Sequence, residues 1–216
     1  RYYLNGLMMR IFTRQLKLVG SDVHRLAIYE DTIEETGIES RIIIPRKGVL
    51  ELVRLLDVNE DIDINVEFSR NNIRVVIDTL TFSAKLVDSK YPDFGKVFEQ
   101  AFNSPVLVKK QDLKEALTRV AILSNEKFKG VEFIIKGDDL KISTNNPEHE
   151  EADEDIGIEY LGNDLSIAFN SQYILDAVSN LESDTAVLTI AENASSCFIE
   201  ESSEQNYKFI VMPMRL

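Results

Sequence analysis

Short stretches in which hydrophobic and polar residues alternate recur along the whole chain, and they predict many β-strands. Ile64, Val66 and Phe68 alternate with polar residues, which is the pattern of a strand with one buried face. Similar stretches, or short runs of β-branched residues, predict strands at 7–12, 16–19, 42–44, 64–68, 73–77 and 82–86, and again at 130–135, 140–144, 186–190, 196–199 and 207–211. Residues 6–33 are expected to form paired strands.

Three other stretches have the spacing of amphipathic helices, in which apolar residues recur every three or four positions. The first begins near Pro45, because proline suits a first helical turn. The second begins near Gln111, and the third follows Asn170, a good capping residue. The apolar residues that share one helix face are Val49, Leu52, Val53 and Leu56 in the first, Leu113, Leu117 and Val120 in the second, and Ile174, Val178 and Leu181 in the third.

The two halves of the chain repeat one another. The stretch from Gly6 to Leu18 lines up with Gly130 to Ile142, and the stretch from Pro45 to Leu56 lines up with Asn170 to Leu181 at nearly the same offset. A repeat of this length indicates duplicated α+β domains rather than a stacked array, with chance similarity of two α+β domains as the alternative. A polar connection at 103–105 predicts the boundary, which gives domains at 1–103 and 104–216.

The composition is that of an ordinary globular protein with one or two domains: 216 residues, 44% hydrophobic and 28% charged. The net charge of −13 argues against a protein coated in DNA-binding surface, but it leaves room for a local basic face. A single cysteine, Cys197, fits a reducing compartment. With no signal peptide and no membrane-length apolar run, we expect a cytoplasmic protein. Because the chain lacks an initiator Met, we expect it to be a piece of a longer protein.

Few residues could support catalysis. Asp22 and His24 would share a face of an extended strand as a base and its orienting group, but no serine nucleophile is positioned with them. Two histidines and one cysteine are too few for a zinc site unless carboxylates contribute. No glycine-rich phosphate loop precedes a predicted helix. We therefore expect no enzyme activity, no catalytic residue, no metal and no cofactor.

Charged residues cluster in two ways. Residues 148–155 are mostly acidic, which is typical either of a solvated face or of a strip that docks a basic partner. Basic residues gather instead on or beside the predicted helices, and usually such charges only solvate a helix face. Their recurrence in both halves suggests one common basic surface that could contact DNA. These residues are Arg46, Lys47, Arg54, Lys109, Lys110, Lys114 and Arg119.

The C-terminal stretch 209–216 stays apolar to its last residue, whereas most chain ends are polar. Pro213 should stop the strand predicted at 207–211, because proline has no N–H to donate to a neighbouring strand. Two methionines and a leucine follow, and flexible apolar side chains suit an adaptable binding surface. The alternative is a terminal strand that merely docks on its own core.

Five ordered stretches closely resemble the bacterial DNA polymerase III beta subunit, the sliding clamp family. They span the whole chain: Ser21–Ala27, Pro45–Val49, Lys85–Asp93, Ala121–Phe128 and Val211–Leu216. The resemblance implies a DNA-clamp fold of class α+β, in which duplicated domains place helices on the inner face of a ring and antiparallel sheets on the outer face. This chain resembles the middle and C-terminal domains only, with the middle domain incomplete at its N-terminus.

The function that the resemblance implies is that of a non-enzymatic processivity factor. Family members join two subunits head to tail around duplex DNA. They tether the DNA polymerase III catalytic subunit, the clamp loader and repair proteins through a hydrophobic pocket for short peptides. Because the first domain is absent, this chain alone is expected to be monomeric rather than a closed homodimer. Without the resemblance, the alternative is a two-domain acidic adaptor that binds peptides and never meets DNA.

The family's peptide pocket lies between these two domains and receives a short segment of Gln and hydrophobic residues. The matching positions are Leu4, Ser21, His24, Arg25, Leu26, Pro92, Lys96, Val97, Ser196, Ile210, Val211, Met212, Pro213, Met214 and Arg215. Three positions depart from the family pattern: Ser21 replaces the usual Thr, Val23 the usual Gly, and Lys96 the commoner Arg. A branched side chain at position 23 is expected to narrow the pocket or to strain the loop.

The resemblance also assigns DNA contacts and a subunit interface. DNA-binding positions match Arg1, Tyr2 and Tyr3 in an opening loop, and Arg46 and Lys47 on the helix that lines the hole. The residues expected to meet the absent domain are Ile122, Leu123, Glu148, Glu150, Glu151, Asp153 and Glu154.

Overall fold

The computed structural model describes residues 4–56, 63–203 and 206–215, which form two compact units. The first unit contains the described residues up to Val23 and those from Ile28 to Asp93. The second unit contains His24–Ala27 and the described residues from Phe94 onward, so strand β3 (Arg25–Thr32) is divided between the two. Both units combine antiparallel sheets with a small number of helices, and the predicted α+β class is therefore confirmed.

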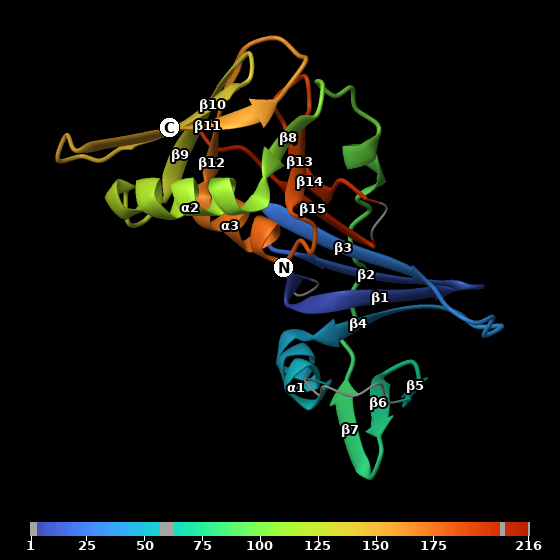
Figure 1. Ribbon diagram of the computed structural model, residues 1–216. Coiled ribbons are helices and arrows are strands. Elements are labelled where there is room, and N and C mark those ends of the chain that lie inside the picture. The colour runs from blue at the N-terminus through green and yellow to red at the C-terminus, as the bar shows by residue number, and fades with distance from the viewer. Residues whose placement is uncertain (1–3, 57–62, 204–205, 216) are drawn as a thin grey trace. The chain divides into compact units, whose positions relative to one another are not determined.

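In the first unit, two groups of antiparallel strands flank one helix (Figure 1). Strand β1 lies between β2 and β4, with Met8 opposite Val19 and Met9 opposite Ile42. Strand β6 lies between β5 and β7. The elements are β1 (Gly6–Phe12), β2 (Gln15–Ser21), the part of β3 from Ile28, β4 (Glu39–Pro45), α1 (Arg46–Leu56), β5 (Ile64–Phe68), β6 (Asn72–Ile77) and β7 (Leu80–Lys85).

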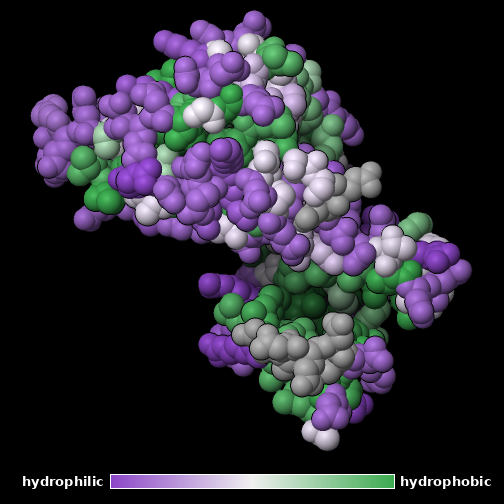
Figure 2. All heavy atoms as spheres, viewed as in Figure 1, coloured by the Kyte–Doolittle hydropathy of each residue, from purple (hydrophilic) through white to green (hydrophobic). Residues whose placement is uncertain are grey.

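Helix α1 begins directly after Pro45, as predicted, and packs on the core of the first unit through Gly48. A Cβ atom at Gly48 would lie 3.4 Å from Phe82 Cζ and 3.4 Å from Ala84 Cβ, so the absence of a side chain permits this close approach. Val49 and Leu52 pack on the buried cluster, whereas Val53 of the same predicted stripe is 62% exposed. Figure 2 shows hydrophobic side chains at the surface of this unit.

The second unit contains one continuous antiparallel sheet in the order β12-β9-β10-β11-β8-β13-β14-β15. Helices α2 and α3 pack side by side against it (Figure 1). Its elements are the short 3-10 helices η2 (Gly95–Phe98) and η3 (Ala121–Leu123), α2 (Lys110–Val120), α3 (Ser171–Ser179), β8 (Val106–Lys109), β9 (Gly130–Lys136), β10 (Asp139–Asn145), β11 (Glu151–Glu159), β12 (Leu165–Asn170), β13 (Thr185–Ile190), β14 (Cys197–Glu201) and β15 (Tyr207–Val211).

The helix faces predicted in the second half are confirmed. Every residue predicted for these two faces is buried, with Leu113, Leu117, Ile174 and Val178 fully so, although Leu181 lies just beyond the end of α3. Asn170 caps α3 as expected, because its side-chain oxygen accepts hydrogen bonds from the backbone N–H groups of the first turn. Burial of this apolar face is the main force that holds both helices on the sheet.

The predicted repeat also appears in the order of the elements. In each unit a two-stranded hairpin precedes a strand that leads directly into a helix, and three more strands follow. Strand β4 pairs with β1, and in the same way β12 pairs with β9. The two helices α1 and α3 therefore occupy equivalent positions in the two units.

Residues 94–103 belong to the second unit. Phe98 and Phe102 pack edge-on against the ring of Phe198 in β14. Phe102 also forms an isolated β-bridge with Ala191, and the Asn103 N–H donates to the carbonyl oxygen of Ile190. The domain boundary between 103 and 104 stays a prediction, and the packing of these residues divides the chain after Asp93.

Candidate functional site

The C-terminal tail is fixed by two main-chain hydrogen bonds. The Met212 N–H donates to the His24 carbonyl oxygen at 2.8 Å, and the Met214 N–H donates to the Ala168 carbonyl oxygen in β12, also at 2.8 Å. Pro213 between them has no N–H to donate. The tail therefore docks on its own unit through its main chain.

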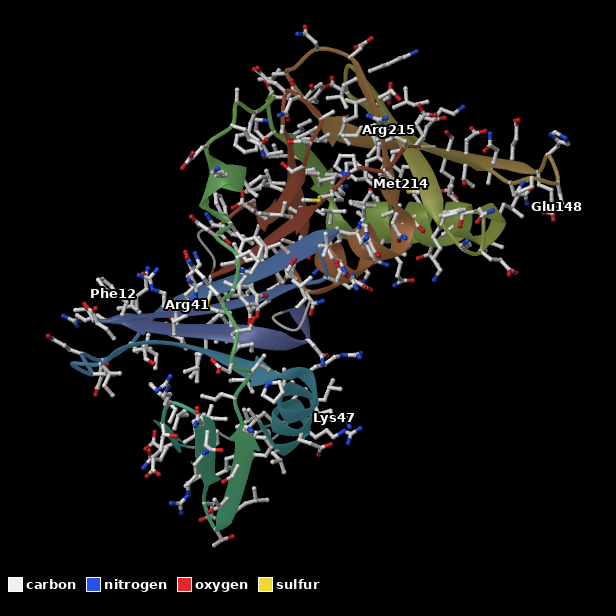
Figure 3. The ribbon with its side chains drawn as sticks, turned by 180° about the vertical axis from the view of Figure 1, so that it is seen from behind. Phe12, Arg41, Lys47, Glu148, Met214 and Arg215 are labelled. Carbon is white, nitrogen blue, oxygen red and sulfur yellow. The ribbon has the colours of Figure 1, made fainter. Side chains whose placement is uncertain are left out.

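Burial separates the tail residues into two groups. Ile210 and Val211 are buried, and so is Leu26 of the predicted pocket. Met212 is 45% exposed, Pro213 and Met214 are half-buried, and Arg215 is exposed. Figure 3 shows Met214 and Arg215 at the end of the traced tail. Leu26, Ile210 and Val211 thus support the tail from the core, while Met212 and the residues after it supply the accessible surface.

Arg25 is held by two residues of α3. Its Nη1 atom lies 2.5 Å from Asp176 Oδ2, and its guanidinium group lies over the Tyr173 ring, 4.3 Å from the centroid. The His24 ring stacks on the same tyrosine at 6.4 Å between centroids. Tyr173 therefore contacts both Arg25 and His24, two of the predicted pocket residues.

Asp176 is ionised over a wider pH range than an ordinary aspartate. Burial alone would raise its pKa, but the hydrogen bonds from Arg25 and Gln172 outweigh that effect and lower the pKa. Sequence reasoning missed both Asp176 and Tyr173. Their only signal was a position in the first turns of a helix that follows Asn170, which does not reveal a partner far away in the sequence.

Gln100 ties η2 to the turn before β14. Its Nε2 atom donates to the Val97 carbonyl oxygen at 2.8 Å and to Ser196 Oγ at 2.7 Å. Its Oε1 atom accepts from Ser195 Oγ. Ser196 is buried by this arrangement, whereas Lys96 is exposed. Two predicted pocket residues, Val97 and Ser196, are therefore linked through a glutamine that the sequence prediction did not include.

The remaining predicted pocket residues, Leu4, Ser21 and Pro92, belong to the first unit and are half-buried there. Between Ser21 and His24 the backbone is strained. Val23 has a φ angle of +85°, a region that β-branched residues rarely adopt, and its side chain is 41% exposed. The expected loop strain at this position is present.

The basic residues on or beside the helices differ in their exposure and in their partners. Arg46 and Lys47 are exposed at the start of α1, where Figure 3 shows Lys47 pointing away from the helix. Arg54 pairs with Glu51 at 2.9 Å, and Lys110 donates to the Leu181 carbonyl oxygen. The predicted DNA contacts Arg1, Tyr2 and Tyr3 lie outside the described residues.

Most of the acidic run, residues 151–155, lies in a strand that the sequence analysis did not predict. Strand β11 begins at Glu151, and its alternating residues point to opposite faces of the sheet. Asp153 pairs with Lys141 at 3.0 Å. Glu154 points the other way and forms two hydrogen bonds with Arg119 of α2.

The ion pair between Glu154 and Arg119 shifts the pKa of both groups. The hydrogen bond from Arg119 lowers the pKa of Glu154, and the same bond raises the pKa of Arg119. Part of the acidic run is therefore neutralised within its own unit, and so is Arg119, one of the basic residues.

The other predicted interface residues are mostly exposed. Glu148 remains exposed at the tip of the β10–β11 hairpin (Figure 3), and Glu150 and Glu151 are exposed beside it. In η3, Leu123 is half-buried and Ile122 is 76% exposed.

Cys197 is fully buried, and burial raises the pKa of its thiol. A thiol in this state is a poor nucleophile. In the described part of the chain, no group of three or more His, Cys, Asp or Glu residues is arranged to hold a metal ion. No helix formed by those residues is both long and apolar enough to cross a membrane.

Two family models match successive parts of the chain. The DNA polymerase III beta subunit, central domain, matches residues 1–93, and the C-terminal domain of the same subunit matches residues 95–215. The chain is 39% identical over its whole length to the beta sliding clamps of Salmonella typhimurium and of Escherichia coli K12. It spans about 59% of the length of these relatives.

Solved structures of sliding clamps superpose on the whole chain. A DNA polymerase sliding clamp from Pseudomonas aeruginosa has a TM-score of 0.95 at 37% identity, and the match covers 100% of this chain and 60% of that one. A beta subunit from Thermotoga maritima has a TM-score of 0.92 at 28% identity, with 58% of its chain covered. The predicted clamp fold is therefore confirmed, and the chain belongs to the DNA polymerase III beta subunit family, the bacterial sliding clamps.

Proposed function

We propose that the chain is the central and C-terminal part of a DNA polymerase processivity factor. The observation that carries the proposal is the match of the entire chain to consecutive clamp domains, with a TM-score of 0.95 to a solved clamp. In this function the protein encircles duplex DNA and is retained by topology, so it needs no catalytic group. A cytoplasmic location belongs to the same proposal.

The proposed partner site is the exposed surface of the C-terminal tail. It binds the short Gln-containing hydrophobic segments of the DNA polymerase III catalytic subunit, the clamp loader and repair proteins. The docked tail supports this proposal, because its main chain is fixed at both ends while Met212 remains accessible. An unbranched thioether side chain can adapt to an entering peptide at little cost. A related clamp from P. aeruginosa has been solved bound to griselimycin.

The proposed DNA contact is electrostatic and independent of sequence. Arg46 and Lys47 open α1, are exposed, and form no ion pair with any described residue. Such lysine and arginine side chains attract phosphate groups without reading bases. Weak contacts of this kind suit a clamp, because they allow sliding while the ring prevents dissociation.

The proposed subunit interface includes Ile122 and Leu123, with Glu148, Glu150 and Glu151 beside the β10–β11 tip. A bulky aliphatic side chain that is 76% exposed, as Ile122 is, suits an interface better than it suits solvent. Exposed acids near it would steer a basic partner surface into register. Asp153 and Glu154 belong to the same predicted interface, but their charges are already paired within the unit.

The deciding experiment measures retention on DNA of the longer parent protein from which this chain comes. A clamp loaded by its loader should stay on circular duplex DNA and should slide off when the circle is cut. A peptide-binding adaptor that never meets DNA would be recovered equally poorly with the circular DNA and with the cut DNA. Retention that is independent of DNA topology would contradict the encircling function.

A further inference from the structure

A structural feature of the C-terminal tail is repeated in the first unit. After β7, residues 86–91 cross back over β4, and the Val87 N–H donates to the Ile43 carbonyl oxygen at 2.9 Å. After β15, the tail crosses back over β12 in the same way, through Met214 and Ala168. Strands β4 and β12 hold equivalent positions, so residues 86–91 are the first-unit counterpart of the tail.

This crossing segment borders a cavity of about 420 Å³ that lies wholly within the first unit. The floor of the cavity is apolar, because Ile42, Ile43 and Leu86 line it and are buried. Tyr91 closes one side and is itself anchored by a hydrogen bond from its hydroxyl group to the Val19 carbonyl oxygen. The cavity is large enough for one or two side chains of an extended peptide.

The charges around the cavity differ from those of the whole chain. Arg41, Arg70 and Lys90 line it, against a single acid, Asp88, in a protein with a net charge of −13. None of these three cations forms an ion pair with a described residue. The Nη2 atom of Arg41, labelled in Figure 3, donates to the Tyr91 carbonyl oxygen at 2.9 Å, which fixes its guanidinium group beside the cavity.

We propose that this cavity is a second docking site, which binds a short acidic peptide segment carrying one aliphatic anchor. The aliphatic side chain would lie on the floor formed by Ile42, Ile43 and Leu86. Carboxylates on either side would pair with Arg70 and Lys90 at the rim, where the paired charges select the partner. A nucleic acid fits less well, because its backbone needs a continuous basic surface and Asp88 interrupts this one. The proposal is independent of the clamp function.

The test uses the 216-residue chain and a fluorescein-labelled peptide, Gly-Glu-Glu-Leu-Glu-Glu-Gly, with binding followed by fluorescence anisotropy. The test variant carries Arg70→Glu and Lys90→Glu, which are exposed positions where a charge change should not disturb folding. The matched control carries Arg14→Glu and Lys136→Glu, which are also exposed but do not line the cavity. We expect the test variant to bind the peptide about tenfold more weakly and the control to bind within about twofold of the original chain.

Two further measurements identify the ligand class and the site. Inorganic phosphate and a short duplex DNA are titrated against the labelled peptide, and a Gln-Leu-x-Leu-Phe type peptide is added as a competitor for the tail site. The proposal requires that none of these three competitors displaces the acidic peptide at concentrations near the dissociation constant of the acidic peptide. Displacement by phosphate or DNA would overturn the peptide assignment, and displacement by the hydrophobic peptide would place the binding at the tail.

Equal loss of binding in the test and control variants would also overturn the proposal, because it would show attraction to net charge alone. So would undetectable binding of the acidic peptide to the original chain at low salt, where surface attraction is strongest. Neither result would affect the clamp function, which is tested separately on circular DNA.

Discussion

The guanidinium group of Arg25 is bonded to the carboxylate of Asp176 and lies on the ring of Tyr173, so a residue of β3 is fixed to α3 by charge and by stacking. The contact joins two segments that are far apart in the sequence. Both side chains remain partly exposed to solvent, at 36% and 44%, which limits the free energy that the pair can contribute.

The Asp176→Asn variant should lose about 0.5–1 kcal/mol of unfolding free energy at neutral pH, since a partly exposed ion pair with a good hydrogen bond is worth about that much. The pKa of Asp176 is lowered in the folded chain, so the stabilisation is present above the ordinary aspartate pKa. It is lost as the pH falls through the lowered folded value. Urea unfolding of both proteins at neutral and strongly acidic pH measures the difference, which should vanish in acid.

Glu51→Gln provides the control for this comparison, because Glu51 pairs with Arg54 on the exposed surface of α1. It should change the unfolding free energy by less than about 0.5 kcal/mol. A loss in Asp176→Asn that stayed constant down to strong acid would show that the ion pair is not its cause.

Val23→Gly should stabilise the chain. Removing the backbone strain of a β-branched residue at a φ angle of +85° should raise the free energy of unfolding by roughly 1–3 kcal/mol. The added freedom of glycine in the unfolded chain should lower it by roughly 0.5–1 kcal/mol. The net expectation is a gain of about 1 kcal/mol, measured as a higher urea midpoint. Val23→Ala keeps a Cβ atom at the same φ and should gain clearly less. A Val23→Gly protein less stable than the original would disprove the strain argument.

Removal of residues 212–216 should abolish binding of a Gln-Leu-x-Leu-Phe type peptide while the fold survives. Val211, the last strongly buried residue of β15, is retained, so the core remains complete. Binding near micromolar, about −8 kcal/mol, is expected for the intact chain. The single substitution Met212→Ala should weaken peptide binding by about 2 kcal/mol, which is the loss expected at a hot-spot residue. Calorimetry of all three proteins tests this, and equal affinities in cooperatively melting proteins would show that the tail is only a docked strand.

Arg46→Ala combined with Lys47→Ala should weaken DNA binding equally on all sequences and flatten its salt dependence. On duplex DNA, the slope of log affinity against log salt is negative, and its magnitude falls by about 0.9 for each phosphate that the variant no longer neutralises. The slope of the double variant should therefore be less steep by about two at most. Arg54→Ala on the same helix removes a residue already paired with Glu51 and should change the slope little. Binding that depends on DNA sequence would contradict the proposal.

A protein made of these 216 residues alone should be monomeric at micromolar concentration, because they span only about 59% of the length of the related clamps. Light scattering measures this directly, and a stable closed dimer would refute it. In the longer parent protein, Ile122→Asp should shift the assembly toward monomer, because it would bury an unpaired carboxylate at the interface. Glu126→Gln, an exposed change beyond η3, is the control and should leave the assembly intact.

The sequence by itself determined the local elements wherever burial follows a regular period. Helices α2 and α3 were predicted with their buried faces because Leu113, Leu117, Ile174 and Val178 recur at helical spacing. The Asn170 cap was predictable for the same reason, since it depends only on the residues that follow it. The family was also evident in the sequence, because its motifs are short, ordered and spread over the whole chain.

Tertiary structure alone decided which side chains meet. Strand β11 escaped prediction because acidic residues fill its alternating positions. Only the tertiary fold brings Lys141 of β10 to one face of the strand and Arg119 of α2 to the other. In the same way, Arg25 and Asp176 have complementary charges that no local pattern links. Periodicity records whether a residue is buried within its own element, whereas pairing between elements depends on how the whole chain folds.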